Sequence, residues 1–242
     1  MTRDQIVNAM ALTGIVPCWR YDDTSAIIEA SKAMCDIGMN SVELTMTMPG
    51  TLRLIERAAA ELPKGTLVGA GTVLDAETAR MAILAGANYI VSPTLVPEVI
   101  TMCHRYGVAA VAGAFSPTEI LAAKTLGADV VKIYPAGLFG ANQLAETLTV
   151  IPGIRTAASG GIALADTGRF ITAGADMVVI GMPHIALPSY VDRTFTGMQR
   201  IGSRLLEIVR EARDPAVRAR MGAESLRRYT DLGDAKTAAA AR

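Results

Sequence analysis

A glycine repeat runs through most of the chain and limits the folds that it can adopt. A short apolar run rich in β-forming residues follows each glycine closely, and successive glycines lie 20 to 27 residues apart. Each interval has room for one strand, one loop and one helix of about three turns. The repeat glycines are Gly14, Gly38, Gly65, Gly86, Gly107, Gly127, Gly153 and Gly174.

Helix-like segments precede several of these glycines, for example TSAIIEASKAMCDI, DAETARMAILA and PTEILAAKTL. Glycine ends a helix at low cost because it has no Cβ to hinder the left-handed conformation. The runs after the glycines are apolar rather than alternating, as in parallel strands that are covered on both faces. Eight near-equal units without a GxGxxG opening predict an α/β fold, the (β/α)8 TIM barrel, over the alternative of a doubly wound open sheet.

The end of the chain departs from the repeat. The region after residue 182 is long, helical in pattern and rich in arginine, and its first part can supply the eighth helix of the barrel. We predict a barrel over residues 1–213 and a C-terminal helical extension and tail over residues 214–242. The arginines of the extension are typical of a solvated or subunit-packing face.

Charge and composition exclude several classes of function. Lys+Arg and Asp+Glu balance at 23 each, so nothing indicates a nucleic-acid or anionic-membrane partner. No stretch approaches the roughly 18 apolar residues of a membrane span, and MTRDQIVNAM does not resemble a signal peptide. Cys18, Cys35 and Cys103 show no metal-ligand spacing. We therefore expect a cytoplasmic protein with reduced thiols, no metal and no cofactor.

Lys132 stands among Val130, Val131, Ile133 and Tyr134, a run that otherwise predicts a buried strand. An ammonium group is costly to bury without a partner. It could be a lysine that extends from the strand end into water, or one paired with a buried carboxylate. The functional alternative is an amine that desolvation leaves less protonated, so that it attacks a carbonyl and forms a Schiff base.

Glu43 in SVELTM is a similar anomaly in the second strand. Its carboxylate is either the structural partner of a buried cation or a general acid/base. In a closed barrel, side chains from strands two and six can both face the interior at the catalytic end. A nucleophilic amine and a carboxylate that moves protons are the minimum apparatus for carbon–carbon cleavage through an imine.

Two features are candidate anion ligands. Ser159, Gly160 and Gly161 form a turn before a helix that we expect near Ala165, and free backbone N–H groups at such turns bind anions. The alternative is a tight turn that needs glycine for its conformation alone. Arg20, after the first strand, could bind a carboxylate or a phosphate, or lie on the surface.

Four further residues at strand ends are candidate substrate contacts. Thr72 could bind a small carboxylate, with Gly71 allowing close approach of the backbone, or the glycines could fill a tight core layer. Pro93 could line the pocket or simply end a strand. Phe115 could cover the pocket or pack internally.

Five segments together resemble the KDPG/KHG aldolases, class I aldolases that act on 2-keto-3-deoxy-6-phosphogluconate or 4-hydroxy-2-oxoglutarate. The resemblance runs from about residue 15 to residue 181. It implies that Lys132 forms the imine and Glu43 is the general acid/base. It also implies that Thr72 binds the pyruvate carboxylate and that the 159–161 turn holds the distal phosphate, in a metal-free homotrimer. The segments are SVELTMTMP, LVGAGTVLDAE, YIVSPTLVPEVI, VVKIYPAGLFG and SGGIALAD.

Two positions depart from the family pattern. Many members carry an arginine four residues after the catalytic glutamate, where this chain has Thr47, and Arg20 is a candidate replacement. Some members have a serine after strand eight, where this chain has Met182 and Pro183. The distal anion of the substrate could therefore be a phosphate or a sulfonate.

The sequence predicts a class I aldolase that cleaves a 2-keto-3-deoxy sugar acid with a terminal anion. The first candidate is 2-keto-3-deoxy-6-phosphogluconate, cleaved to pyruvate and glyceraldehyde 3-phosphate. The same chemistry on the 6-sulfo analogue (giving sulfolactaldehyde), the galactonate epimer or 4-hydroxy-2-oxoglutarate is the alternative. More remote are a phosphate-binding barrel isomerase, in which Lys132 is only an electrostatic group, and a non-catalytic barrel that binds an anionic metabolite.

Overall fold

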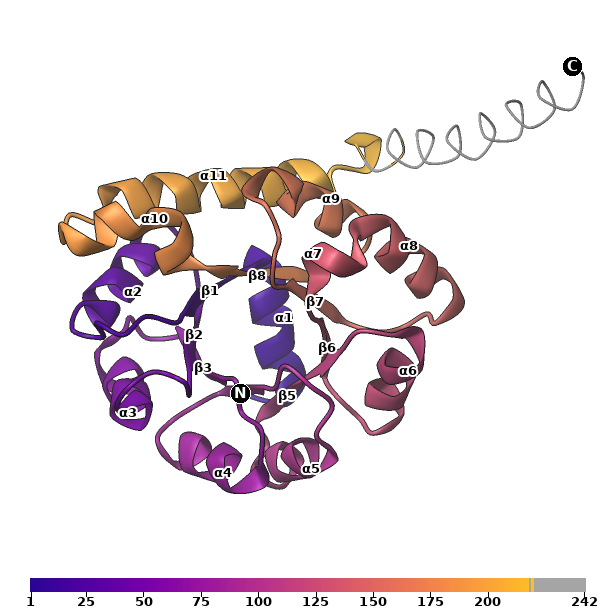
Figure 1. Cartoon of the computed structure of the whole chain (residues 1–242), viewed down its shortest axis with the longest axis horizontal. Coiled ribbons are helices and arrows are strands. Elements are labelled where there is room, and N and C mark those ends of the chain that lie inside the picture. The colour runs from indigo at the N-terminus through magenta and orange to yellow at the C-terminus, as the bar shows by residue number, and fades with distance from the viewer. Residues whose placement is uncertain (218, 220–242) are drawn as a thin grey trace, which may run out of the picture.

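Eight parallel strands close into a barrel with helices around it (Figure 1). The computed structural model describes residues 1–217 and 219, apart from the side chains of residues 183–185. Each strand pairs with the next along the chain, and β1 pairs with β8 from Ile15–Val178 to Cys18–Gly181. The predicted TIM barrel is confirmed, and the open-sheet alternative is wrong. The strands are β1 (Ile15–Trp19), β2 (Ser41–Thr45), β3 (Leu67–Gly71), β4 (Tyr89–Val91), β5 (Ala109–Ala114), β6 (Val130–Ile133), β7 (Thr156–Ser159) and β8 (Met177–Gly181).

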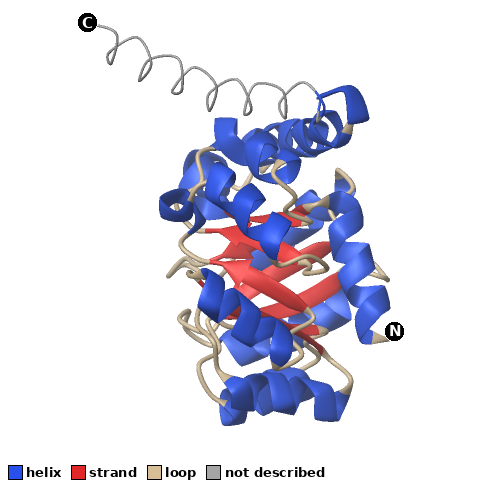
Figure 2. Ribbon diagram, turned by 90° about the vertical axis from the view of Figure 1, so that its right-hand side faces the viewer, coloured by secondary structure: helices blue, strands red, loops and turns tan. Residues whose placement is uncertain are grey.

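The strands form a central layer that the helices enclose (Figure 2). All eight repeat glycines have positive φ, between 70° and 110°, as expected for the left-handed residue that ends a helix. The helices are α1 (Arg3–Thr13), α2 (Ile27–Asp36), α3 (Thr51–Glu61), α4 (Ala76–Leu84), α5 (Pro97–Tyr106), α6 (Pro117–Thr125), α7 (Ala136–Phe139), α8 (Ala141–Val150), α9 (Thr167–Thr172) after the 3₁₀ turn η1 (Leu164–Asp166), α10 (Met182–Val191) and α11 (Thr196–Arg213).

Alternation along the strands separates two cores. Inward-facing strand residues, such as Val16, Tyr89 and Val111, fill the barrel interior. The strand residues that face outward, such as Trp19 and Leu44, pack under the surrounding helices. Side chains of successive strand residues point to opposite faces, so position in the strand decides which core a residue joins.

Helix α1 closes the N-terminal end of the barrel, a role that the sequence pattern did not reveal. Its residues Ile6, Val7 and Met10 are buried against the barrel interior. Arg3 forms an ion pair with Asp129, just before β6, at 2.9 Å. Because this end is covered, ligands can approach the interior from the C-terminal ends of the strands.

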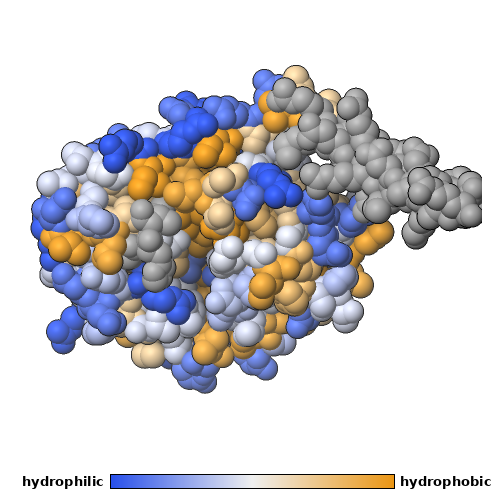
Figure 3. All heavy atoms as spheres, turned by 45° about the horizontal axis from the view of Figure 1, so that its top comes forward, coloured by the Kyte–Doolittle hydropathy of each residue, from blue (hydrophilic) through white to orange (hydrophobic). Residues whose placement is uncertain are grey.

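The C-terminal helices cover one side of the barrel, where α11 packs against α9, α10 and α2. Figure 3 turns this side toward the viewer and shows hydrophilic side chains beside apolar ones. Arg213 at the end of α11 donates to the carbonyl oxygens of Leu12 (2.8 Å) and Asp176 (2.9 Å). These bonds tie the last helix to α1 and to the loop before β8.

Helix α11 supplies the expected eighth helix and ends at Arg213, where we placed the end of the barrel. Most of the proposed extension, including its arginines, lies outside the described residues, so the division at residue 214 stays a prediction. Within residues 1–217 and 219, no helix is long and apolar enough to cross a bilayer.

Candidate active site

Two neighbouring pockets, which form the first and second lobes of the site, open at the C-terminal ends of the strands. The first lobe, of about 480 Å³, brings together the ends of β1, β2, β6, β7 and β8. The second, of about 380 Å³, lies toward β3, β4 and β5. Arg20 and Tyr134 line both lobes. Of the predicted site residues, the first lobe holds Arg20, Glu43, Lys132, Ser159, Gly160 and Gly161, and the second holds Arg20, Thr72, Pro93 and Phe115.

Lys132 and Glu43 meet inside the first lobe. The lysine Nζ lies 3.7 Å from Oε1 of Glu43, and the two side chains are only 7% and 1% exposed. Each charge would be costly to bury alone, and their attraction offsets part of that cost. The distance exceeds that of a direct hydrogen bond, so the pair is an electrostatic contact beside an open cavity. An amine and a carboxylate placed this way can act on one bound molecule.

The two oxygens of the Glu43 carboxylate have different surroundings. Oε1 faces Lys132 and accepts a hydrogen bond from Cys18 Sγ at 3.5 Å. Oε2 is buried and has no hydrogen-bond partner within the described part of the chain. A buried acceptor without a partner is uncommon in proteins, so Oε2 has an unused capacity to accept a hydrogen bond.

Gly71 makes room for this carboxylate. A Cβ added at Gly71 would lie 2.1 Å from Oε1 of Glu43, far inside the contact distance. Gly71 lines neither lobe of the cavity. The close approach that this glycine allows is therefore to Glu43 on the neighbouring strand β2, whereas the sequence suggested an approach to substrate.

The 159–161 turn presents its backbone to the first lobe. Ser159 ends β7, and Gly160 and Gly161 both have positive φ, 85° and 68°. A Cβ at Gly160 would lie 2.7 Å from the ring of Tyr134. The helix expected near Ala165 begins as the 3₁₀ turn η1 at Leu164 and continues as α9.

Arg20 is the cation that reaches both lobes. Its Nη2 donates to Oγ1 of Thr72 at 2.8 Å, and Thr72 has a positive φ of 59°. Arg20 and Lys132 are the cationic residues among the described residues that line the cavity. Thr47 is exposed, lines neither lobe and lies 3.1 Å from the hydroxyl of Thr45.

Pro93 and Phe115 form apolar walls of the second lobe. The ring of Phe115 packs edge-to-face on Phe139 of α7, with 5.7 Å between the centroids. Pro93 lies directly over Gly113, where a Cβ would come within 2.1 Å of its backbone. Phe115 is 43% exposed at the rim of the cavity.

Sequence reasoning missed Cys18 and Tyr134, the residues of the first lobe that lie beside the Lys132–Glu43 pair. The Tyr134 ring lies beside the amine, with its centroid 5.4 Å from Lys132 Nζ. Cys18 is paired in register with Glu43 across β1 and β2. The alternation of Val16 and Cys18 in β1 with Arg20 just after it was the signal that could have found the cysteine, because residues two apart share a face.

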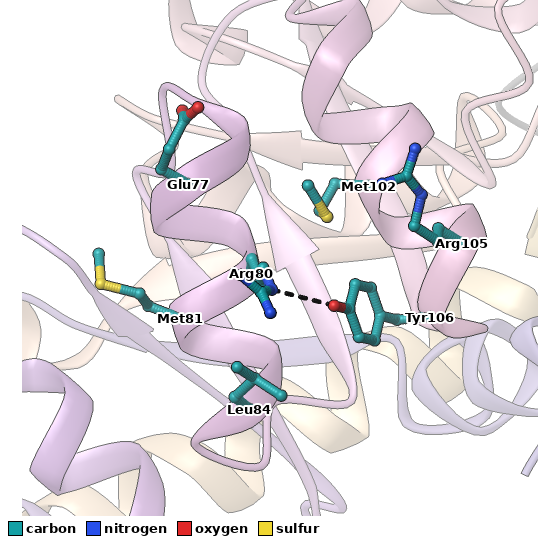
Figure 4. A pocket seen from close by; sticks show the side chains of 7 residues that line it. All are labelled: Glu77, Arg80, Met81, Leu84, Met102, Arg105 and Tyr106. Carbon is teal, nitrogen blue, oxygen red and sulfur yellow. Dashed lines mark hydrogen bonds between the residues drawn. The ribbon is translucent and has the colours of Figure 1, made fainter.

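A separate groove of about 470 Å³ lies on the outside of the barrel between α4 and α5 (Figure 4). Arg80 Nε donates to the Tyr106 hydroxyl there at 3.0 Å. None of the predicted site residues lines this groove. Within the described residues, no group of three or more His, Cys, Asp or Glu could hold a metal ion.

A barrel whose open end holds a buried lysine beside a buried glutamate has the apparatus of an imine-forming carbon–carbon lyase. The family model "KDPG and KHG aldolase" matches residues 6–191, and the chain belongs to this family. The family comprises class I pyruvate aldolases, which are aldehyde-lyases.

Several individual proteins are similar to the chain. A probable 2-dehydro-3-deoxy-6-phosphogalactonate aldolase of Rhizobium meliloti is 35% identical over 54% of this chain and 62% of the relative. A 2-dehydro-3-deoxy-phosphogluconate aldolase of Treponema pallidum is 28% identical over 84% of this chain and 97% of the relative. The crystal structure of the 2-keto-3-deoxy-6-phosphogluconate aldolase of Zymomonas mobilis ZM4 with 3-phosphoglycerate has a TM-score of 0.73 and 25% identity, covering 84% of this chain and 96% of that one.

Proposed function

We propose that this protein cleaves a 2-keto-3-deoxy-6-phosphohexonate, with 2-keto-3-deoxy-6-phosphogluconate as the first candidate, to pyruvate and glyceraldehyde 3-phosphate. The observation that carries the proposal is the buried pair of Lys132 and Glu43, whose Nζ and Oε1 lie 3.7 Å apart at the open end of the barrel. The family to which the chain belongs supports it.

Lys132 supplies the covalent step. Its unprotonated Nζ attacks the C2 carbonyl of the keto acid to give a carbinolamine, and loss of water leaves a protonated imine at C2. The positive nitrogen then accepts the electron pair of the C3–C4 bond as that bond breaks. The product on the enzyme is an enamine of pyruvate, and the C4–C6 fragment leaves as an aldehyde.

Glu43 moves the protons that these steps require. Its carboxylate takes the proton of the C4 hydroxyl as C3–C4 breaks, so that C4 becomes the aldehyde carbon. The proton then goes to C3 of the enamine, and water hydrolyses the resulting imine to pyruvate and free Lys132. Oε2 of Glu43, which has no hydrogen-bond partner among the described residues, is the acceptor that we assign to the substrate hydroxyl.

Two groups bind the charged ends of the substrate in this proposal. Arg20 and Thr72, which are joined by a 2.8 Å hydrogen bond, bind the C1 carboxylate at the junction of the lobes. The backbone of the 159–161 turn holds the distal phosphate in the first lobe. Pro93 and Phe115 form walls of the second lobe. The absence of a side chain at Gly71 leaves the space that the Glu43 carboxylate occupies.

Trapping with borohydride tests the chemistry directly. We expect pyruvate and sodium borohydride together to inactivate the enzyme and leave a reduced pyruvate adduct on Lys132, located by peptide mass spectrometry. Borohydride alone should leave activity and mass unchanged. An adduct on a different lysine, or no adduct, would overturn the imine mechanism.

A second candidate substrate is the C4 epimer, 2-keto-3-deoxy-6-phosphogalactonate. It is supported by the similarity to the Rhizobium meliloti relative, which is 35% identical over 54% of this chain. Comparing kcat/KM for the two epimers decides between them. The 6-sulfo analogue and 4-hydroxy-2-oxoglutarate complete the panel, because they test whether a distal phosphate is required.

Arg20 gives a separate test of substrate binding. We expect Arg20→Ala to raise KM for the keto acid about 10- to 100-fold, because it removes charge-assisted hydrogen bonds to an anion. Arg20→Lys keeps the charge and should recover part of this loss. Arg53→Ala, on the exposed face of α3, is the matched control and should leave KM unchanged. An unaltered KM in Arg20→Ala would exclude Arg20 as an anion ligand.

The homotrimer implied by the family resemblance stays part of the proposal. Light scattering on the purified full chain measures the number of subunits.

A further inference from the structure

Cys18 lies against the carboxylate of Glu43 but has no part in the proposed covalent chemistry. The two residues are directly paired across β1 and β2, and Cys18 Sγ lies 3.5 Å from Oε1. On its other side Cys18 is paired with Gly181 of β8, which has no side chain to cover it. Cys18 therefore lines the cavity while contacting Glu43.

The groups around Glu43 come from several strands. Lys132 of β6 is the cation, at 3.7 Å from Oε1. Tyr89 of β4 points its hydroxyl to the carbonyl oxygen of Val42 at 2.8 Å, so that donor is already engaged. On β3, Gly69 is paired in register with Glu43 and Gly71 lies against its carboxylate, and neither glycine offers a side-chain donor. Cys18 is thus the neutral side chain that donates to the carboxylate.

The thiol is protonated at neutral pH. Burial raises the pKa of Cys18 well above its usual range, and the negative charge of Glu43 raises it further. A protonated thiol is a weak hydrogen-bond donor and a poor nucleophile. Cys18 is therefore suited to hold a carboxylate in place and unsuited to attack a carbonyl.

We propose that Cys18 is a positioning residue: its S–H donates to Oε1 of Glu43 and thereby directs Oε2 to the hydroxyl of the substrate. This inference rests on the proposed function. Lys132 cannot hold the carboxylate alone, because its Nζ is 3.7 Å away and becomes bonded to C2 during the reaction. The thiol stays a donor throughout, so the carboxylate keeps its orientation while the amine changes its bonding.

The test compares variants that keep and remove the donor. Cys18→Ser retains an O–H, whereas Cys18→Ala and Cys18→Val remove the donor and differ in the space they fill. We expect kcat to fall about 10-fold in both Ala and Val variants with KM within about twofold of the parent protein, and Ser to recover most of the rate. Rates are expressed per molecule that forms the pyruvate–borohydride adduct, so misfolded protein is not counted.

The pH dependence of kcat/KM distinguishes hydrogen bonding by Cys18 from packing, because a residue that only fills space would not change it. A donor to a carboxylate favours its charged form, so losing the donor should move the acid limb of kcat/KM to higher pH in the Ala and Val variants. Cys18→Ser should keep the limb of the parent protein. Unchanged kcat and an unmoved limb in Cys18→Ala, or a Ser variant as slow as Ala, would overturn the positioning role.

Failure of this inference is distinguishable from failure of the proposed function. If the parent protein and all three variants form the adduct on Lys132 and retain equal rates, the aldolase mechanism holds and Cys18 has no positioning role. If the parent protein forms no adduct, the proposed function fails, and the positioning role falls with it.

Discussion

The Lys132→Met variant is expected to lose at least about 10⁴-fold in kcat for cleavage of 2-keto-3-deoxy-6-phosphogluconate. Methionine has a similar length and no amine, so neither the carbinolamine nor the imine can form. Lys132 is 5% exposed overall, and an apolar replacement suits its strand position. The variant leaves the buried Glu43 carboxylate without its cation and should also be less stable, so kcat is expressed per folded molecule. A coupled assay of pyruvate release measures kcat, and thermal unfolding checks the fold.

Lys64→Met is the matched control for this variant. Lys64 is exposed, beyond the end of α3 and outside both lobes of the cavity. Its replacement should leave kcat and adduct formation unchanged. Cleavage by Lys132→Met within about tenfold of the parent rate would contradict the imine mechanism. It would favour the remote alternatives, a barrel isomerase or an anion-binding barrel, over the lyase chemistry.

Glu43→Gln is expected to lower kcat about 10²- to 10⁴-fold, the usual contribution of general acid–base catalysis. Glutamine has the shape of glutamate and fits the space left by Gly71, but it cannot accept and return a proton. The same variant should lose exchange of the pyruvate methyl protons with deuterium oxide, because that exchange passes through the enamine. Nuclear magnetic resonance of pyruvate follows the exchange without the full substrate.

Glu56→Gln on the exposed face of α3 is the control, and it should exchange and cleave at the parent rates. If Glu43→Gln exchanged pyruvate protons normally, another group would carry the proton transfer. Tyr134 would then be the next residue to replace, because its ring lies 5.4 Å from Lys132 Nζ and it lines both lobes.

Lys132 and Glu43 indicated the site because a charged residue is unusual in an apolar strand. A charge in an apolar strand has to be paired or solvated, so two opposite charges at strand ends of one barrel were expected to meet. The 3.7 Å contact shows that they do. Gly71 was harder to interpret, because a glycine reveals that space is needed and does not reveal which group occupies it.

The sequence by itself determined the barrel, because each glycine-bounded unit carries its own local signals for helix end and buried strand. All eight units therefore appeared in the order expected. Tertiary structure alone decided three features: the closure of one end by α1, the contact of Cys18 with Glu43, and the bridging of two lobes by Arg20. The contact of Cys18 with Glu43 depends on the register of β1 with β2, and the closed barrel depends on the meeting of β1 with β8 across 163 residues, from Ile15 to Val178. Local sequence patterns predict which face of the sheet a side chain points to. The register of the strands in the closed barrel determines which side chains of other strands it contacts.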